Sequence, residues 1–226
     1  MNSMENPALS ESELASLVLK SFDKLERMRH EDVAKRCGVI YLRSSESLEG
    51  RYIVNVLNKT YTVEFGQRAV LDLMTGRPAG GKLSYVMLTY LLSDGGPSGT
   101  ESWHPMQSLL KTPTLSSYFQ KSVTRPITKL FGFNSQSFEK CSIALGGVRE
   151  KKMGGVSFSF TFLPKVRLVF QLWVGDPEDL AQPEASISYN TPAPRFLPTI
   201  PLIYACEIIV GFLEKESRSL AGKKRS

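Results

Sequence analysis

Apolar residues recur at helical spacing in the first part of the chain. The steps of three and four that stack side chains on one face of a helix join Leu14, Leu17, Val18, Phe22, Leu25 and Met28. Ser10 and Glu13 stand three residues apart, as in a capping box, so this helix is predicted to begin near Ser10. A second, short helix is predicted over residues 31–36. It would end at Gly38, because glycine adopts the left-handed conformation that closes helices.

Two later segments have the composition and alternation of β-hairpins. Residues 51–65 contain two β-branched and aromatic runs, separated by a predicted turn at Asn58 and Lys59. In residues 156–174, phenylalanines alternate with serines and threonine, and a turn at residues 163–165 leads into a second apolar run. A further short strand is predicted over residues 185–189.

Other apolar segments are predicted to be helical. Residues 69–74 and 83–92 form two such patterns, divided by the glycine- and proline-containing residues 76–81. Residues 202–213 are apolar almost all round, as in a buried helix. The sequence therefore predicts a single α+β domain with antiparallel β-hairpins packed against helices. We divide it into an N-terminal helical segment, a core and a basic C-terminal tail, at residues 1–50, 51–213 and 214–226.

The composition is that of an ordinary globular protein. The chain has 226 residues, of which 42% are hydrophobic and 22% charged, which excludes disordered, coiled-coil and collagen-like proteins. Its three cysteines are far apart and form neither a disulfide framework nor a Cys-x-x-Cys pair. The N-terminus lacks the pattern of a signal peptide, and the longest apolar stretch is too short to span a bilayer. These features predict a soluble cytoplasmic protein without a membrane span.

A net charge of +6 raises the question of nucleic-acid binding. Basic residues gather in the middle of the chain and near its C-terminus, at Lys111, Lys121, Arg125, Lys129 and Lys140 and at Lys215, Arg218, Lys223, Lys224 and Arg225. Tyr118, Phe119, Phe131 and Phe133 lie among the first group. Such aromatics can stack on bases, but more often they fill a core, and no nucleic-acid-binding motif is present. We therefore do not expect nucleic acid as a partner.

Polar residues in three places could bind a ligand. Trp103 and His104 share a predicted loop, where the histidine could act as a ligand or proton shuttle. Asp176 and Glu178, with Asp179, directly follow Trp173 at a strand end, where carboxylates can bind a metal or act as acid and base. Glu207 interrupts the apolar helix and must either pair with a cation or face a cavity. Each group also has a purely structural interpretation, as an exposed loop, a polar turn and an ion pair.

No motif assigns a reaction or a cofactor. The two histidines, His30 and His104, do not lie in the context of a catalytic triad. None of the glycine pairs belongs to a dinucleotide-binding or P-loop motif. No histidine or second acidic motif completes a metal set around Asp176. We therefore predict no catalytic or metal-binding residue, name no cofactor, and leave open whether the protein is an enzyme.

The order of several features resembles a known family. They are the Val63-Glu64-Phe65 strand end, the 83–92 helix, Gly95-Gly96, Trp103, Phe131-Gly132, Gly146-Gly147, the segment from Leu163 to Glu178, and Phe196-Leu197-Pro198. The chain is similar over residues 51–213 to uncharacterised bacterial and archaeal proteins, mainly of anaerobes, classified as a domain of unknown function. The segment from Leu163 to Glu178 is the most specific part of this resemblance.

The resemblance implies a metabolic context for the protein but no particular reaction. Some members of that family carry an added iron-sulfur domain of the kind found in corrinoid one-carbon enzymes, which implies a role near anaerobic cofactor metabolism. This chain lacks such a cysteine cluster. It also has Tyr189-Asn190 and Gly155-Val156 where the family usually has acidic residues. These differences weaken any metal or acid-base role inferred from the family.

These observations favour a cytoplasmic, non-catalytic accessory protein that binds a ligand or cofactor. Its groove would lie between the 158–174 hairpin and the C-terminal helix, and would take a small molecule or a protein partner. The first alternative is an enzyme that uses Asp176, Glu178 or Glu207 together with His104. The second is a nucleic-acid-binding protein that uses the basic stretches. The oligomeric state and the identity of the ligand do not follow from the sequence.

Overall fold

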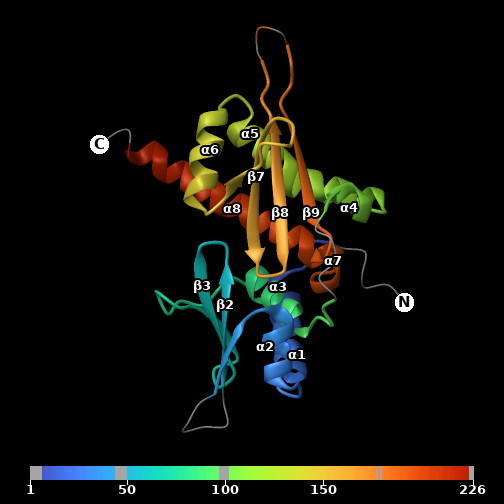
Figure 1. The fold of residues 1–226 in the computed structure, drawn as a ribbon, viewed down its shortest axis with the longest axis vertical. Helices are drawn as coiled ribbons and strands as arrows, with labels where there is room; N and C mark the ends of the chain where they lie inside the picture. Colours follow the sequence, from blue (N-terminus) through green and yellow to red (C-terminus); the bar gives the residue numbers. More distant parts are fainter. Residues whose placement is uncertain (1–6, 44–49, 97–101, 177, 179, 224–226) are drawn as a thin grey trace. The chain divides into compact units, whose positions relative to one another are not determined.

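The computed structural model describes residues 7–43, 50–96, 102–176, 178 and 180–223, with helices and strands labelled in Figure 1. The chain forms two compact units, each assembled from segments far apart in sequence. The first unit contains residues 1–100, 162–166 and 192–205. The second contains residues 101–161, 167–191 and 206–226. The predicted α+β class, with antiparallel strands and helices, is confirmed.

Three helices of the first unit match the sequence pattern. They are α1 (Glu11–Leu25), α2 (His30–Cys37) and α3 (Gly81–Leu92). The predicted capping box is present, since Ser10 Oγ accepts from the Glu13 N–H and the Glu13 carboxylate accepts from the Ser10 N–H. Gly38 ends α2 with a φ of 65°. Because α1 packs against α3, the predicted N-terminal segment and the start of the predicted core share one unit.

A four-stranded antiparallel sheet completes this unit, in the order β1 (Ile40–Leu42), β2 (Arg51–Val56), β3 (Lys59–Glu64) and β4 (Ala69–Asp72). The first predicted hairpin is therefore confirmed, but its turn is shifted by one residue. Val56 pairs with Lys59, so the turn consists of Leu57 and Asn58, and Leu57 has a φ of 55°. The N–H of Leu57 donates to the carbonyl of Phe162, which helps to hold this conformation.

The prediction of a helix over residues 69–74 is wrong. Residues 69–72 form β4, in which Val70 pairs with Val63 of β3. A short apolar run satisfies helical and extended spacing equally well, and the neighbouring strand decides between them by pairing with its backbone. Asp72 then ends the strand, because its carboxylate accepts the N–H groups of Met74 and Thr75.

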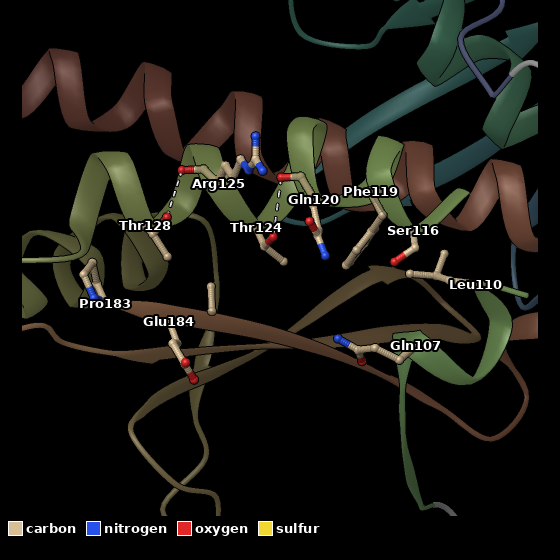
Figure 2. Close-up of a pocket in the computed structure, with 11 residues that line it drawn as sticks. Gln107, Leu110, Ser116, Phe119, Gln120, Thr124, Arg125, Thr128, Pro183 and Glu184 are labelled. Carbon is tan, nitrogen blue, oxygen red and sulfur yellow. Dashed lines mark hydrogen bonds between the residues drawn. The ribbon is translucent and has the colours of Figure 1, made fainter. Parts of the chain in front are cut away.

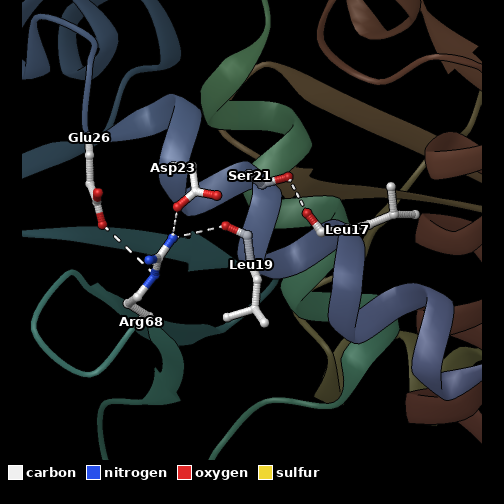
Figure 3. Close-up of polar contacts among 6 residues, drawn as sticks. All are labelled: Leu17, Leu19, Ser21, Asp23, Glu26 and Arg68. Atoms are coloured by element: carbon white, nitrogen blue, oxygen red, sulfur yellow. Dashed lines mark hydrogen bonds and ion pairs between the residues drawn. The ribbon is translucent and has the colours of Figure 1, made fainter.

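Tyr204 and Arg68 of the first unit bond to other parts of the chain. The buried Tyr204 hydroxyl donates to the Pro7 carbonyl at 2.6 Å and accepts from the Leu9 N–H at 3.1 Å. On the surface of α1, Arg68 from the β3–β4 turn is ion-paired with Asp23 and Glu26 (Figure 3). It also donates to the carbonyl of Leu19. The Tyr204 hydrogen bonds hold residues 7–9 against the C-terminal helix, and the Arg68 contacts join the β3–β4 turn to α1.

The second sheet has the strand order β5-β9-β8-β7-β6, in which the β5–β9, β8–β9 and β6–β7 pairs are antiparallel. Its strands are β5 (Trp103–Pro105), β6 (Val148–Arg149), β7 (Val156–Leu163), β8 (Val166–Trp173) and β9 (Glu184–Asn190). The predicted 156–174 hairpin and the 185–189 strand are confirmed. Both faces of β7 are covered, because Ser157 and Ser159 are buried as well as Phe158 and Phe160.

The basic and aromatic residues 109–133, for which the sequence predicted no elements, are mostly helical. After the 3₁₀ turn η1 (Met106–Leu109) come α4 (Pro113–Phe119), the π-helical turn η2 (Gln120–Thr124), α5 (Arg125–Phe131) and α6 (Ser135–Ala144). Phe119 and Phe131 are buried, so these two aromatics fill the core and do not form stacking platforms.

The C-terminal helix is longer than predicted. After the short α7 (Ala193–Phe196), α8 runs from Thr199 to Lys223, beginning in the first unit and continuing in the second. Residues 214–223 of the predicted tail are thus helical, supported by an ion pair between Glu214 and Arg218, and residues 224–226 lie outside the described residues. Among the helices that the structure describes, none combines the length and apolarity needed to cross a membrane.

Candidate functional site

A pocket of about 310 Å³ opens in the second unit between the α4–η2–α5 helices and β9 (Figure 2). We call it the α4–β9 pocket. Its lining is Gln107, Leu110, Ser116, Phe119, Gln120, Thr124, Arg125, Thr128, Pro183, Glu184 and Ala185. Most of these side chains carry hydrogen-bonding groups, while Phe119 supplies buried apolar surface. Such a mixture suits a small polar molecule.

One wall of the pocket is a row of polar residues spaced four apart, Ser116, Gln120, Thr124 and Thr128. Residues four apart lie on the same side of a helix. Thr112 caps the start of α4 with its hydroxyl, which accepts the N–H of Leu115. The row therefore follows directly from the helical backbone.

The helix widens in the middle of this wall. The N–H of Arg125 donates to the carbonyl of Gln120, five residues back, as in a π-helical turn. Pro126 follows and has no N–H, and its ring crowds the carbonyl four residues before it, which disfavours a regular α-helical turn here. Single π turns inside helices occur frequently at functional sites.

The opposite wall comes from the start of β9 and from η1. Pro183 lies close to the end of α5, since a Cβ added to Gly132 would lie 2.6 Å from Pro183 Cγ. Only glycine permits this approach without displacement. Figure 2 shows the amide groups of Gln107 and Gln120 and the hydroxyl of Ser116 pointing into the space between the two walls. Three neutral polar groups from three elements thus converge on one space.

Trp103 and His104, two of the residues singled out in the sequence, lie on β5. The Arg167 guanidinium lies 5.1 Å from the centre of a Trp103 ring. His104 Nε2 lies 3.1 Å from the hydroxyls of Ser102 and Thr191. His104 also stacks at a tilt on Tyr189, its partner in β9. The structure therefore holds this pair within the sheet edge by contacts to neighbouring strands.

Trp173, Asp176 and Glu178 lie at the β8–β9 connection. Trp173 ends β8 and is 40% exposed. The Asp176 carboxylate accepts the N–H of Glu178, and its backbone exchanges two hydrogen bonds with Ala181. These bonds give Asp176 a part in shaping the turn. Asp179, also considered from the sequence, lies outside the described residues.

Glu207 is half-buried on α8, next to the fully buried Cys206. Burial, together with the negative charge of Glu207, raises the pKa of the Cys206 thiol. This thiol is consequently protonated and unreactive at neutral pH.

The six predicted residues do not form one site. Trp173 pairs with Glu184 at one end of β9, and Trp103 pairs with Asn190 at the other end. Six residues of strand separate these positions by roughly 20 Å, so His104 and Asp176 are too far apart to act on one atom. None of the six lines the α4–β9 pocket. Within the described residues, no three His, Cys, Asp or Glu side chains are grouped as metal ligands.

The sequence pattern did not identify the pocket residues, because only a short run of polar positions marks them. Polar residues four apart in 116–128 and Pro126 inside a helical run were visible, but they indicate a helix face rather than a pocket. The second wall, at residues 183–185, joins this face only through the tertiary structure.

A family model described as "Domain of unknown function (DUF3786)" matches residues 29–211. The chain belongs to this family. The DUF3786 region begins before residue 51, where the resemblance in the sequence was recognised, and so includes α2 and β1. It spans both compact units and contains every residue of the α4–β9 pocket. Neither the curated proteins nor the solved structures contain a match to the chain.

Proposed function

We propose that this DUF3786 protein is a cytoplasmic, non-catalytic accessory protein that binds a small polar molecule in the α4–β9 pocket. The observation that carries the proposal is the convergence of Gln107, Ser116 and Gln120 on one space beside a π-helical turn (Figure 2). Amide groups both donate and accept hydrogen bonds, and a hydroxyl does the same, so this set suits a ligand rich in hydroxyl, amide or carbonyl groups.

The size of the pocket supports a small ligand. A volume of about 310 Å³ lies at the lower end of the range for small-molecule sites. Phe119 adds an apolar surface against which the body of a ligand can pack. The groove expected between the 158–174 hairpin and the C-terminal helix is replaced in this proposal by the α4–β9 pocket.

A binding role is favoured over catalysis by the distribution of the titratable groups. His104 lies at one end of β9 and the acidic residues Asp176 and Glu178 lie beyond the other end. General acid-base chemistry requires such groups within a few ångströms of one reacting atom. The neutral polar residues Gln107, Ser116 and Gln120 of the pocket, in contrast, supply hydrogen bonds.

The proposed cytoplasmic location and the proposed metabolic role rest on separate observations. Cys37, Cys141 and Cys206 are free and buried, which agrees with a reducing cytoplasm. A role near anaerobic one-carbon or corrinoid metabolism rests on the resemblance described in the sequence and remains part of the proposal.

A matched pair of variants tests the binding role. Ser116→Phe would fill the pocket from α4, whereas Ser117→Phe places the same ring on the exposed side of the same helix. The full chain is titrated with small neutral polyols and amides, beginning with glycerol and acetamide, and followed by ¹H–¹⁵N NMR. We expect saturable shifts of amides lining the pocket in the wild type and in Ser117→Phe, and none in Ser116→Phe. Equal binding by both variants, or no binding by the wild type, would refute the proposal.

A further inference from the structure

The helices that form the pocket carry an unusual distribution of charge. Residues 102–138 contain four lysines and arginines, Lys111, Lys121, Arg125 and Lys129, and neither aspartate nor glutamate. All four cations are exposed. In the described part of the chain, no carboxylate is ion-paired with any of them. This positive surface is therefore not neutralised by the fold.

Three of these cations form what we call the cation row, Lys121, Arg125 and Lys129. They are four residues apart and span about 12 Å along the helix. Each directly follows a residue of the polar wall, namely Gln120, Thr124 and Thr128, so the two rows run side by side. Arg125 itself belongs to the lining of the pocket. The cation row thus borders the pocket along the length of η2 and α5.

We propose that the ligand of the α4–β9 pocket carries an oxyanion, a phosphate or a carboxylate group, that binds to Arg125 at the edge formed by the cation row. This inference rests on the proposed function and names its substrate class. A guanidinium presents paired N–H donors that match the two oxygens of such a group, and Lys121 and Lys129 add positive potential on either side. Gln107, Ser116 and Gln120 bind the neutral part of the same ligand.

The acidic residue of the pocket does not oppose this arrangement. Figure 2 shows the carboxylate of Glu184 pointing away from the helices and the guanidinium of Arg125 on the side of the helix away from Glu184, at the edge of the pocket, so the two charges do not face each other. A negative charge at the far wall lowers the affinity for an anion without occupying its binding position. Removal of that charge by Glu184→Gln is therefore expected to strengthen anion binding.

A small anion is favoured over a nucleic acid by the surrounding aromatic residues. Single-strand binding uses exposed rings on which bases stack, next to a positive groove. Phe119 and Phe131, the aromatics closest in sequence to the row, are buried, and Phe133 is the largely exposed ring of this group, whereas a stacking surface needs several such rings. The cation row instead adjoins a pocket of small volume.

The test compares phosphate with acetate as probes at constant ionic strength, with the full chain and NMR detection. We expect saturable binding of at least one probe at the pocket, and a roughly tenfold loss of affinity in Arg125→Gln. Lys140→Gln, the control, removes the same charge from α6, outside the row, and is expected to bind as the wild type does. The probe that binds more tightly identifies the kind of oxyanion.

Four results would overturn the inference. The first is binding of glycerol or acetamide without binding of phosphate or acetate. The second is an equal loss of anion affinity in Arg125→Gln and Lys140→Gln, and the third is weaker anion binding in Glu184→Gln. The fourth is tighter, steeply salt-dependent binding of a thymidine oligonucleotide. The first of these leaves the proposed function intact. Loss of both neutral and anionic probes in the wild type would instead remove the pocket as a binding site.

Discussion

Arg68 and Arg125 carry the same charge in the two units, but their surroundings differ. Arg68 is held between Asp23 and Glu26 and donates to the Leu19 carbonyl, so it joins the β3–β4 turn to α1 (Figure 3). Arg125 belongs to a helical region without a carboxylate and lines a pocket (Figure 2). The first arginine is ion-paired within the fold, whereas the second has no carboxylate partner among the described residues and is available to a ligand. Partners within the chain therefore separate structural cations from candidate binding groups.

The same contrast extends to neutral polar groups. In the first unit, the hydroxyls of Tyr204 and Tyr90 each accept and donate hydrogen bonds to the backbone. In the second unit, the amides of Gln107 and Gln120 point into an open space. The two tyrosine hydroxyls thus stabilise the fold, whereas the amides of Gln107 and Gln120 face a space that a small molecule can enter.

Truncation of one buried aromatic ring in each unit should distinguish an effect on stability alone from an effect on both stability and ligand binding. Phe22→Ala in α1 removes a buried ring from the core, and Phe119→Ala in α4 removes a buried ring that also lines the pocket. We expect both to lower the free energy of unfolding by about 3–5 kcal/mol, measured by urea denaturation. Phe119→Ala alone should also alter binding of the pocket probes under conditions where both variants remain folded. Equal effects of the two variants on binding would show that the pocket does not depend on Phe119.

Neutralisation of Arg68 and of Arg125 should change the thermal stability of the protein to different extents. Arg68→Gln removes two ion pairs and a hydrogen bond, and we expect a lower midpoint of thermal unfolding by circular dichroism. Arg125→Gln removes no ion pair, and its midpoint should equal that of the wild type in buffer without an anionic ligand. If Arg125→Gln destabilises the protein as much as Arg68→Gln does, Arg125 is a structural residue.

A smaller, pH-dependent effect is expected from His30 in the first unit. Its ring stacks on Tyr41, and Nδ1 lies 2.8 Å from the Tyr52 hydroxyl. Burial lowers the pKa of His30, the charge of Arg43 lowers it further, and Glu31 acts in the opposite direction. The unfolded chain therefore binds this proton more readily than the folded chain. Stability is complete above the unfolded value of about 6.5 and falls as the pH drops below it.

Variants of the two histidines check this effect. We expect the free energy of unfolding to fall less steeply with acidification in His30→Gln than in the wild type. The control, His104→Gln on β5, shows whether removal of a histidine elsewhere in the chain changes the slope by as much. An unchanged slope in His30→Gln would show that protonation of His30 does not contribute to acid destabilisation.

The parts of the fold that depend on nearby residues could be predicted from the sequence. The Ser10–Glu13 capping box and the glycine that ends α2 act within a few residues, and the structure contains both. The long alternation in residues 156–174 identified its hairpin for the same reason. The strand at residues 69–72 could not be recognised, because its extended form depends on pairing with β3.

The candidate site was harder to predict than the fold. Trp103, His104, Trp173 and Asp176 were selected because polar and aromatic residues clustered in sequence, but β9 separates the two clusters. The polar row of α4–η2–α5 had a visible spacing of four, yet only its proximity to residues 183–185 makes a pocket. Side chains from distant segments must meet in space before their chemistry can be inferred.

A phosphate titration of the uniformly ¹⁵N-labelled full chain would test whether phosphate binds near Arg125 of the cation row and not near the ion-paired Arg68. Shifts confined to amides of η1, α4, η2, α5 and the start of β9, saturating together, are the expected result. Shifts around Arg68 and α1 of similar size, or weak non-saturating shifts at exposed lysines throughout the chain, would contradict it. In that case the charge distribution of the α4–β9 pocket would not distinguish it from the rest of the surface.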